Sequence, residues 1–211
     1  MTVRNHVIRG AIASEHIVQF FDSDESRAEN VASFLAEGYR AGEPIVVIAR
    51  PVNWVLMMER LQFLGVPVQS AIAQGALIVK DANQTLGEIC PSGGSPDAAA
   101  FDAVVGKAVT ALSRRGRVRA YGEMVDMLAQ RGELASAITL EQLWNDLGER
   151  ASFFLMCGYS AAHFVSTGTH RALLDICKSH SGVQHHAQDP LANWLLTTAH
   201  NGTRGSAALR H

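Results

Sequence analysis

The stretch from residue 16 to 49 constrains the fold of this chain more than any other. It begins with a short apolar run, Ile17 to Phe21, which is rich in residues that favour β-strands. Apolar residues then recur at the spacing of one helix face, and the stretch ends in the continuous apolar run PIVVIA at 44–49. Such a run is typical of a strand buried on both faces of a parallel sheet. We therefore predict a strand–helix–strand unit, whose first turn is a natural ligand position in α/β folds.

The turn after the first predicted strand, FDSDES at 21–26, lacks the residues that bind nucleotide phosphates. A phosphate-binding loop needs glycines, which let backbone N–H groups approach the anion, and a lysine to meet its charge. This turn has neither, and Asp22, Asp24 and Glu25 crowd the helix N-terminus. We expect Asp22 to be the N-cap, with Glu25 as its capping-box partner, and Gly42 to end the helix. The phosphate site is then filled by the chain's own side chains, and ATP and GTP should not bind.

Strands and helices alternate along the rest of the chain, which predicts a three-layer α/β fold with a mostly parallel sheet flanked by helices. The last part differs, because short amphipathic segments alternate there with polar linkers. We predict a leader at 1–15, the main domain at 16–168, a short helical C-terminal appendage at 169–200 and a disordered tail at 201–211. Further strands are expected at 76–79, 118–121 and 152–158, and helices at 53–64, 68–74, 97–115, 135–150 and 170–180.

Charge, hydropathy and cysteine spacing argue against several classes of protein. The 211 residues carry a formal net charge of -2 at pH 7, which gives no general reason to bind nucleic acid. The apolar runs are far shorter than a membrane span and the N-terminus lacks a signal peptide's apolar core, so we expect a cytoplasmic protein. Cys90, Cys157 and Cys177 form no CxxC pair, which argues against a disulfide framework or a zinc site. We expect Cys157 to be buried and inert, whereas Cys177 could sense redox state only if exposed.

Several short motifs occur in an order that resembles a known family. They are His16-x-x-x-Phe20-Phe21-x-x-Asp24, GEPIVVIA, LGV, GALIVKDA, RAYGEMVDML, LEQLWN and SFFLMCGYSAAHF, with an echo in ICKSHS. No motif is specific by itself, but their order and spacing from about 16 to 164 resemble the MEDS sensory domain. The resemblance implies a RecA/KaiC-like core that has lost its phosphate loop, and a non-catalytic sensory or regulatory role.

The resemblance also implies a class of partner, because such domains are usually fused to signalling modules or stand alone. The implied partner is a signalling protein such as a histidine kinase or a transcription regulator, and the alternatives are a small-molecule ligand and a homodimer. This chain contains no recognisable kinase or DNA-binding module, so the resemblance does not identify the signalling process that the domain controls. No cofactor, membrane or direct nucleic-acid contact is expected. Two other functions stay open, a degenerate nucleotide-binding enzyme that uses Glu123 and a pure protein-interaction adaptor.

The candidate ligand-binding residues are His16, Phe20, Phe21, Asp24 and Glu123. The resemblance favours a pocket lined by the first three, although an isolated histidine often bonds a neighbouring carboxylate and aromatic side chains are more often core. Asp24 could instead cap its helix. Glu123 ends a strand at the carboxyl edge of the sheet, where it either contacts a ligand or caps the next helix.

The segments between 170 and 200 carry apolar faces that two short helices cannot bury alone. Leu173, Leu174, Trp194 and Leu195 form the candidate interaction surface, since exposed Trp and Leu clusters are typical of partner sites. Docking on the chain's own domain is the equal alternative.

Other features favour ordinary structural roles. Trp144 is expected in the core, and the arginines from Arg114 to Arg119 are expected to be solvated rather than bound to an anionic partner. His180, His185 and His186 could bind a transition metal, because imidazole is a common ligand. Adjacent histidines do not easily reach one ion, and no Cys, Asp or Glu lies at familiar metal spacing, so we predict no metal site.

Overall fold

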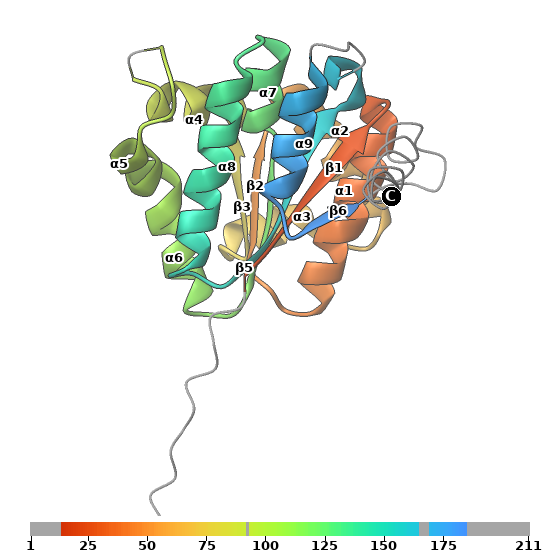
Figure 1. Cartoon of the computed structure of the whole chain (residues 1–211). Helices are drawn as coiled ribbons and strands as arrows, with labels where there is room; N and C mark the ends of the chain where they lie inside the picture. The colour runs from red at the N-terminus through yellow and green to blue at the C-terminus, as the bar shows by residue number, and fades with distance from the viewer. Residues whose placement is uncertain (1–13, 92, 165–168, 185–211) are drawn as a thin grey trace, which may run out of the picture.

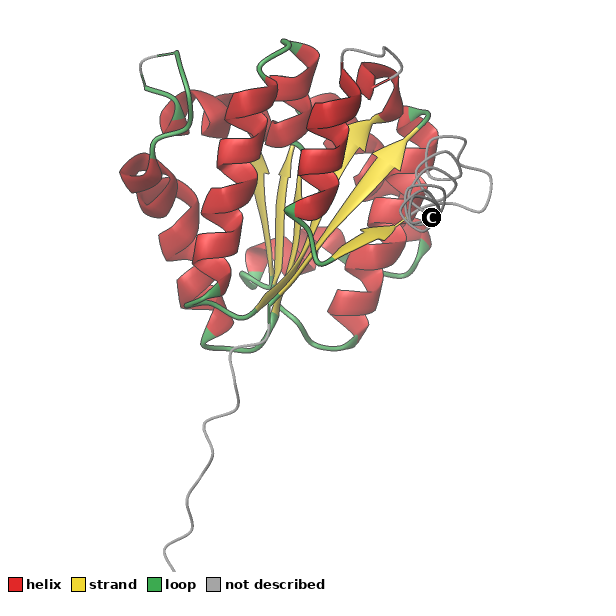
Figure 2. Cartoon of the chain, in the orientation of Figure 1, coloured by secondary structure: helices red, strands yellow, loops and turns green. Residues whose placement is uncertain are grey.

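The computed structural model describes residues 14–91, 93–164 and 169–184 (Figure 1). At its centre six strands form one sheet in the order β3-β2-β4-β5-β1-β6 (Figure 2). Every described strand pair is parallel, which confirms the predicted α/β class. The strands are β1 (Glu15–Phe21), β2 (Ile45–Ala49), β3 (Leu77–Asp81), β4 (Val118–Gly122), β5 (Phe153–Ser160) and β6 (Gly182–Gln184).

Helices cover both faces of the sheet, which confirms the predicted three layers (Figure 2). The first face carries α1 (Asp24–Arg40), α2 (Pro51–Phe63) and α3 (Val68–Ala73). The second face carries α4 (Ala82–Ile89), α5 (Ala98–Phe101), the π-helical segment η1 (Asp102–Gly106), α6 (Lys107–Ser113), α7 (Met124–Gln130), α8 (Leu134–Gly148) and α9 (His170–Lys178). The short 3-10 helix η2 (Ala161–Phe164) follows β5. None of the helices in these described ranges is both long enough and apolar enough to span a lipid bilayer.

The N-cap of the first helix lies one residue later in the chain than predicted. The N-cap of α1 is Ser23, whose hydroxyl accepts the backbone N–H of Ser26 at 3.1 Å. The prediction of Asp22 as the cap is wrong, because Ser23 has the extended backbone that an N-cap needs and Asp22 is exposed before it. Gly42 follows the helix with a φ of 73°, a conformation that glycine adopts without steric cost, as the predicted end of the helix requires.

The fifth strand is central, between β4 and β1, and both of its faces are covered. Phe153, Leu155 and Cys157 point to the core under α8, while Met156 points to the opposite core under α1. Phe154 shares that opposite face but is half-buried, since it packs at the margin of the core. The alternation of apolar side chains that a doubly covered parallel strand requires is therefore present.

The described part of the C-terminal segment packs on the domain itself. The α9 helix lies against α8, and Leu173 is fully buried in the same core as the central strand. After this helix β6 joins the sheet beside β1. Leu174 is exposed on the outer face of α9, and Trp194 and Leu195 lie outside the described residues.

Candidate functional site

Two carboxylates and two guanidinium groups meet where β4 ends. Glu123 follows β4 directly and Asp126 lies in the first turn of α7, so both carboxylates come from one short stretch of chain. Arg27 reaches them from α1, and Arg50 from the junction of β2 and α2. The carboxyl ends of parallel strands share one edge of a sheet, and this edge is where open α/β folds bind ligands.

Glu123 is fully enclosed by hydrogen-bond donors. Its Oε2 accepts from Asn53 Nδ2 at 2.7 Å and from Arg27 Nη1 at 3.2 Å. Its Oε1 accepts the backbone N–H of Arg50, and Tyr121 contributes a longer hydroxyl contact of 3.4 Å to Oε2. The side chain is 0% exposed, so Glu123 is committed to these donors and is not poised as a free base.

Asp126 links the same arginines to β5, the next strand along the chain. Its Oδ2 accepts from Arg50 Nη2 at 2.5 Å, and its Oδ1 accepts the backbone N–H of Ser160 at 2.6 Å. The Nε2 atom of His163 lies 3.1 Å from Oδ1. The network therefore ties the ends of β2, β4 and β5 together.

The arginines carry stable positive charges despite their burial. Burial alone lowers the pKa of Arg27, but the neighbouring Tyr121, Asp126 and Glu123 outweigh it, so this pKa lies above the ordinary arginine value. Burial and Glu123 also raise the pKa of Tyr121, which keeps its hydroxyl protonated. The two arginines and the two carboxylates neutralise each other's charges, as buried charged groups must.

A cavity of about 210 Å³ opens above this network. Most of its lining residues have polar or charged side chains, and they are Asp24, Arg27, Arg50, Val52, Asn53, Asp126, Gln130, Ser160 and His163. Ligand pockets for drug-sized molecules span about 300–1,000 Å³. The cavity therefore suits a molecule smaller than a nucleotide.

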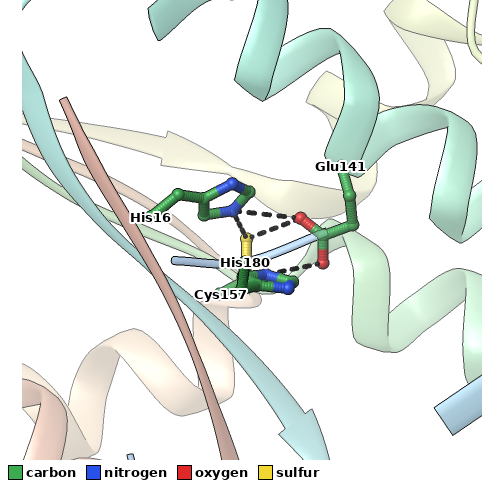
Figure 3. Close-up of side chains that lie close together, drawn as sticks. All are labelled: His16, Glu141, Cys157 and His180. Atoms are coloured by element: carbon green, nitrogen blue, oxygen red, sulfur yellow. Dashed lines mark hydrogen bonds and ion pairs between the residues drawn. The ribbon is translucent and has the colours of Figure 1, made fainter. Parts of the chain in front are cut away.

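A second cluster of polar side chains lies inside the domain, under α8 and α9 (Figure 3). His16 comes from β1, Glu141 from α8, Cys157 from β5, and His180 from the turn after α9. His16 Nε2 lies 3.1 Å from Glu141 Oε2 and 3.2 Å from Cys157 Sγ, and the Cys157 thiol donates to Glu141 Oε2 at 3.1 Å. His180 Nε2 lies 3.3 Å from Glu141 Oε1, which also accepts from Tyr159 at 2.8 Å.

The charges in this second cluster depend on one another. Burial would raise the pKa of Glu141, but His180 and His16 outweigh it and hold the pKa below its usual range. Burial together with Glu141 raises the pKa of both Cys157 and Tyr159, so both keep their protons. An anionic carboxylate thus accepts hydrogen bonds inside the core.

With both clusters placed, the chain can be compared with known families. Residues 15–181 match the model of MEDS, the MEthanogen/methylotroph, DcmR Sensory domain. The chain belongs to the MEDS family. A search of the curated proteins found no match to it. The MEDS match confirms the family resemblance of the motifs and implies a sensory or signalling role. It extends through α9, which packs on the core of the MEDS domain.

The MEDS domain does not bring the five candidate ligand residues into one pocket. Asp24 lines the cavity and Glu123 lies beneath it. Phe21 is buried with its ring 5.4 Å from the Arg27 guanidinium, on the same side. Phe20 points to the opposite face of the sheet and packs against Phe164.

His16 lies further still from the cavity. It sits near the amino end of β1 and belongs to the second cluster, where it is 5% exposed. The alternation of side chains along β1 places His16 and Phe20 on the face that α8 covers, and Phe21 on the face that α1 covers.

Four charged residues of the two clusters were not singled out from the MEDS sequence, namely Arg27, Arg50, Asp126 and Glu141. Arg27 and Glu141 could have been found, because each is a charged residue on the apolar face of a helix. Arg27 precedes the buried Ala28, and Glu141 lies between the buried Leu140 and Trp144. A charge at such a position indicates a buried partner. Nothing in the local pattern identifies that partner.

We expect MEDS domains with this arrangement to reject nucleotides. The turn before α1 offers no glycine or lysine, and the charge of Arg27, in the first turn of that helix, is already neutralised by Glu123 and Asp126. Calorimetry with millimolar ATP or GTP and magnesium should therefore show no heat of binding. Micromolar binding that disappears in Glu123→Gln would contradict this expectation.

Proposed function

We propose that this chain is a non-catalytic sensory module that binds a small polar molecule in the cavity at the carboxyl edge of its sheet. Membership of the MEDS family supports the sensory role. The observation that carries the ligand proposal is the cavity of about 210 Å³ above the Arg27–Glu123–Asp126–Arg50 network. A cavity whose floor pairs two arginines with two carboxylates binds by hydrogen bonds rather than by net charge.

The lining favours an uncharged or zwitterionic ligand. Gln130, Ser160 and His163 present amide, hydroxyl and imidazole groups, while the arginines are already paired with carboxylates. A strong anion would have to displace Asp126 from Arg50, which would cost this buried carboxylate its shortest guanidinium contact. Small molecules with hydroxyl, amide or amino-acid groups meet the lining without that loss.

The network also supports the absence of catalysis. A general base must be within reach of its substrate and free to accept a proton. Both carboxylates already accept from guanidinium and backbone donors, and Glu123 is enclosed beneath the cavity. Binding rather than turnover is the function that such groups support.

The output partner is proposed to be a signalling protein such as a histidine kinase or a transcription regulator, or a second copy of this chain. The sensory family supports a signalling partner. Ligand binding would favour one arrangement of the β2–α2 and β4–α7 junctions, which are joined across the cavity by the contact between Arg50 and Asp126. An equilibrium shifts only as far as the ligand's differential affinity for the two states, so a partner must contact these junctions or elements packed on them.

A thermal-shift screen of small polar metabolites, including amino acids, polyols and hydroxy acids, tests the ligand proposal. A compound present at about 100 times its Kd adds about 2.7 kcal/mol to the free energy of unfolding and raises the Tm. We expect Gln130→Ala and His163→Ala to weaken the binding of a hit by about 2- to 10-fold, the loss of one hydrogen bond.

Gln142→Ala is the matched control, because Gln142 is an exposed glutamine on α8 outside the cavity lining. This variant should bind each hit as tightly as the unchanged chain. Hits that all bind equally to the Gln130→Ala, His163→Ala and control variants would remove the cavity from the proposal. Sustained ATP hydrolysis by the purified chain would overturn the non-catalytic role.

A further inference from the structure

The buried cluster of His16, Glu141, Cys157 and His180 has the donor atoms and geometry of a metal site (Figure 3). Four different elements supply the four side chains, and one donor atom from each lies within 4.8 Å of all the others. The three shortest separations, among His16 Nε2, Glu141 Oε2 and Cys157 Sγ, are 3.1 Å, 3.1 Å and 3.2 Å. Ligands around tetrahedral zinc are about 3.3–3.7 Å apart, given zinc–ligand bonds of about 2.0–2.3 Å.

Both histidines are held in the orientation that metal ligands adopt. His16 Nδ1 lies 2.8 Å from the Asn145 side-chain oxygen, and His180 Nδ1 lies 2.6 Å from the Ile176 carbonyl oxygen. Oxygens of this kind only accept, so each Nδ1 carries a proton and each Nε2 is the ring nitrogen that faces the cluster. Asn145 is itself oriented, because its Nδ2 donates to the Ser179 carbonyl at 2.9 Å. Such partners behind the ring are typical of metal-binding histidines.

The Nε2 atom of His180 faces the Glu141 carboxylate. The side chain of His180 is 0% exposed, and its Nε2 has no hydrogen-bond partner among the described residues. Glu141 Oε1 lies 3.3 Å from it, and although burial lowers the pKa of His180, this carboxylate raises it above its usual range. A protonated ring pairs with Glu141 here, whereas in the neutral ring the Nε2 lone pair can bind an ion that takes the place of that proton.

We propose that His16, Glu141, Cys157 and His180 bind one divalent transition-metal ion of the zinc class. A donor set of two imidazoles, one carboxylate and one thiolate suits such an ion. Binding releases the Cys157 proton, since the thiolate is the ligand. The thiolate and the Glu141 carboxylate then balance the two positive charges of the ion, so the buried site is neutral.

The site would fasten the end of the domain to its beginning. His16 lies on the first strand and His180 follows α9, while Cys157 and Glu141 come from the central strand and the helix over it. The ion would therefore hold α9 and β6 against the sheet. Because metal binds only the folded arrangement of these four residues, its binding adds to the stability of the fold.

Cobalt substitution of the chain tests the proposal. The purified protein is stripped with a chelator and titrated with Co²⁺ and then with Zn²⁺. We expect one ion per chain, the strong visible absorption of tetrahedral Co²⁺ and a sulfur-to-cobalt charge-transfer band in the near ultraviolet. Zn²⁺ should displace the Co²⁺ and raise the Tm above that of the stripped protein.

Variants distinguish this site from binding by other histidines and cysteines. Cys157→Ser should abolish the charge-transfer band, whereas Cys177→Ser, outside the cluster, should leave it unchanged. Asn145→Ala removes the partner of His16 and should weaken Zn²⁺ binding by about 10- to 100-fold. A spectrum without tetrahedral or sulfur bands, or a stoichiometry and spectrum unchanged by both Cys157→Ser and Asn145→Ala, would overturn the proposal. If Cys157→Ser does not fold, the cobalt spectrum of the unchanged chain and the Zn²⁺ affinity of Asn145→Ala test the proposal instead.

Discussion

Replacing Glu123 with alanine is expected to lower the free energy of unfolding by about 3–5 kcal/mol, the cost of removing one partner of a buried ionic network. The carboxylate is 0% exposed and accepts from Arg27 and Asn53 and from the backbone of Arg50. Its loss leaves the Arg27 guanidinium with Asp126 as its remaining close carboxylate inside the domain. Urea unfolding monitored by circular dichroism measures the change.

Glu59→Ala is the control for this variant, because Glu59 is an exposed carboxylate on α2. Its effect should stay within about 0.5 kcal/mol, the scale of an ordinary surface substitution. A loss below about 1 kcal/mol for Glu123→Ala would show that the network does not depend on this carboxylate, and the description of the cavity floor would then be wrong.

Trp144→Ala is expected to cost about 3–5 kcal/mol, as large aromatic truncations in cores do. Trp144 is 1% exposed on the inner face of α8, which confirms its predicted place in the core. Its ring makes edge-to-face contacts with Phe101 at 5.3 Å and with Phe153 at 5.9 Å between centroids. The truncation leaves a cavity between α8, the central strand and the helix that begins at α5.

Phe63→Ala provides the aromatic control, since Phe63 is 85% exposed at the end of α2. Its effect on the free energy of unfolding should lie within about 0.5 kcal/mol. Equal losses for Trp144→Ala and Phe63→Ala would contradict the burial of Trp144.

The fold could be predicted because its signals are local. The apolar run at 44–49, the helical spacing before it and Gly42 are each read from neighbouring residues, and each is confirmed by β2, by α1 and by the positive φ of that glycine. Choosing between Asp22 and Ser23 as the cap failed, because adjacent residues of the same capping class differ only in backbone conformation.

The two clusters could not be assembled from the sequence, because their members are far apart along the chain. Arg27 and Glu123 are separated by 96 positions, and His16 and Cys157 by 141. Only the order of the strands in the sheet brings them together. The prediction that no metal site exists was drawn from spacing along the chain, and spacing does not detect side chains that four separate elements bring together.

The most direct test of the sensory proposal is hydrogen exchange, monitored by mass spectrometry, with and without the best hit from the metabolite screen. We expect protection at 50–53, 124–130 and 160–163, the segments that supply the cavity lining. The Gln142→Ala control should show the same protection, and His163→Ala should show less at the same ligand concentration. Protection confined to other segments, or the same protection in His163→Ala as in the control, would contradict ligand binding at the carboxyl edge of the sheet.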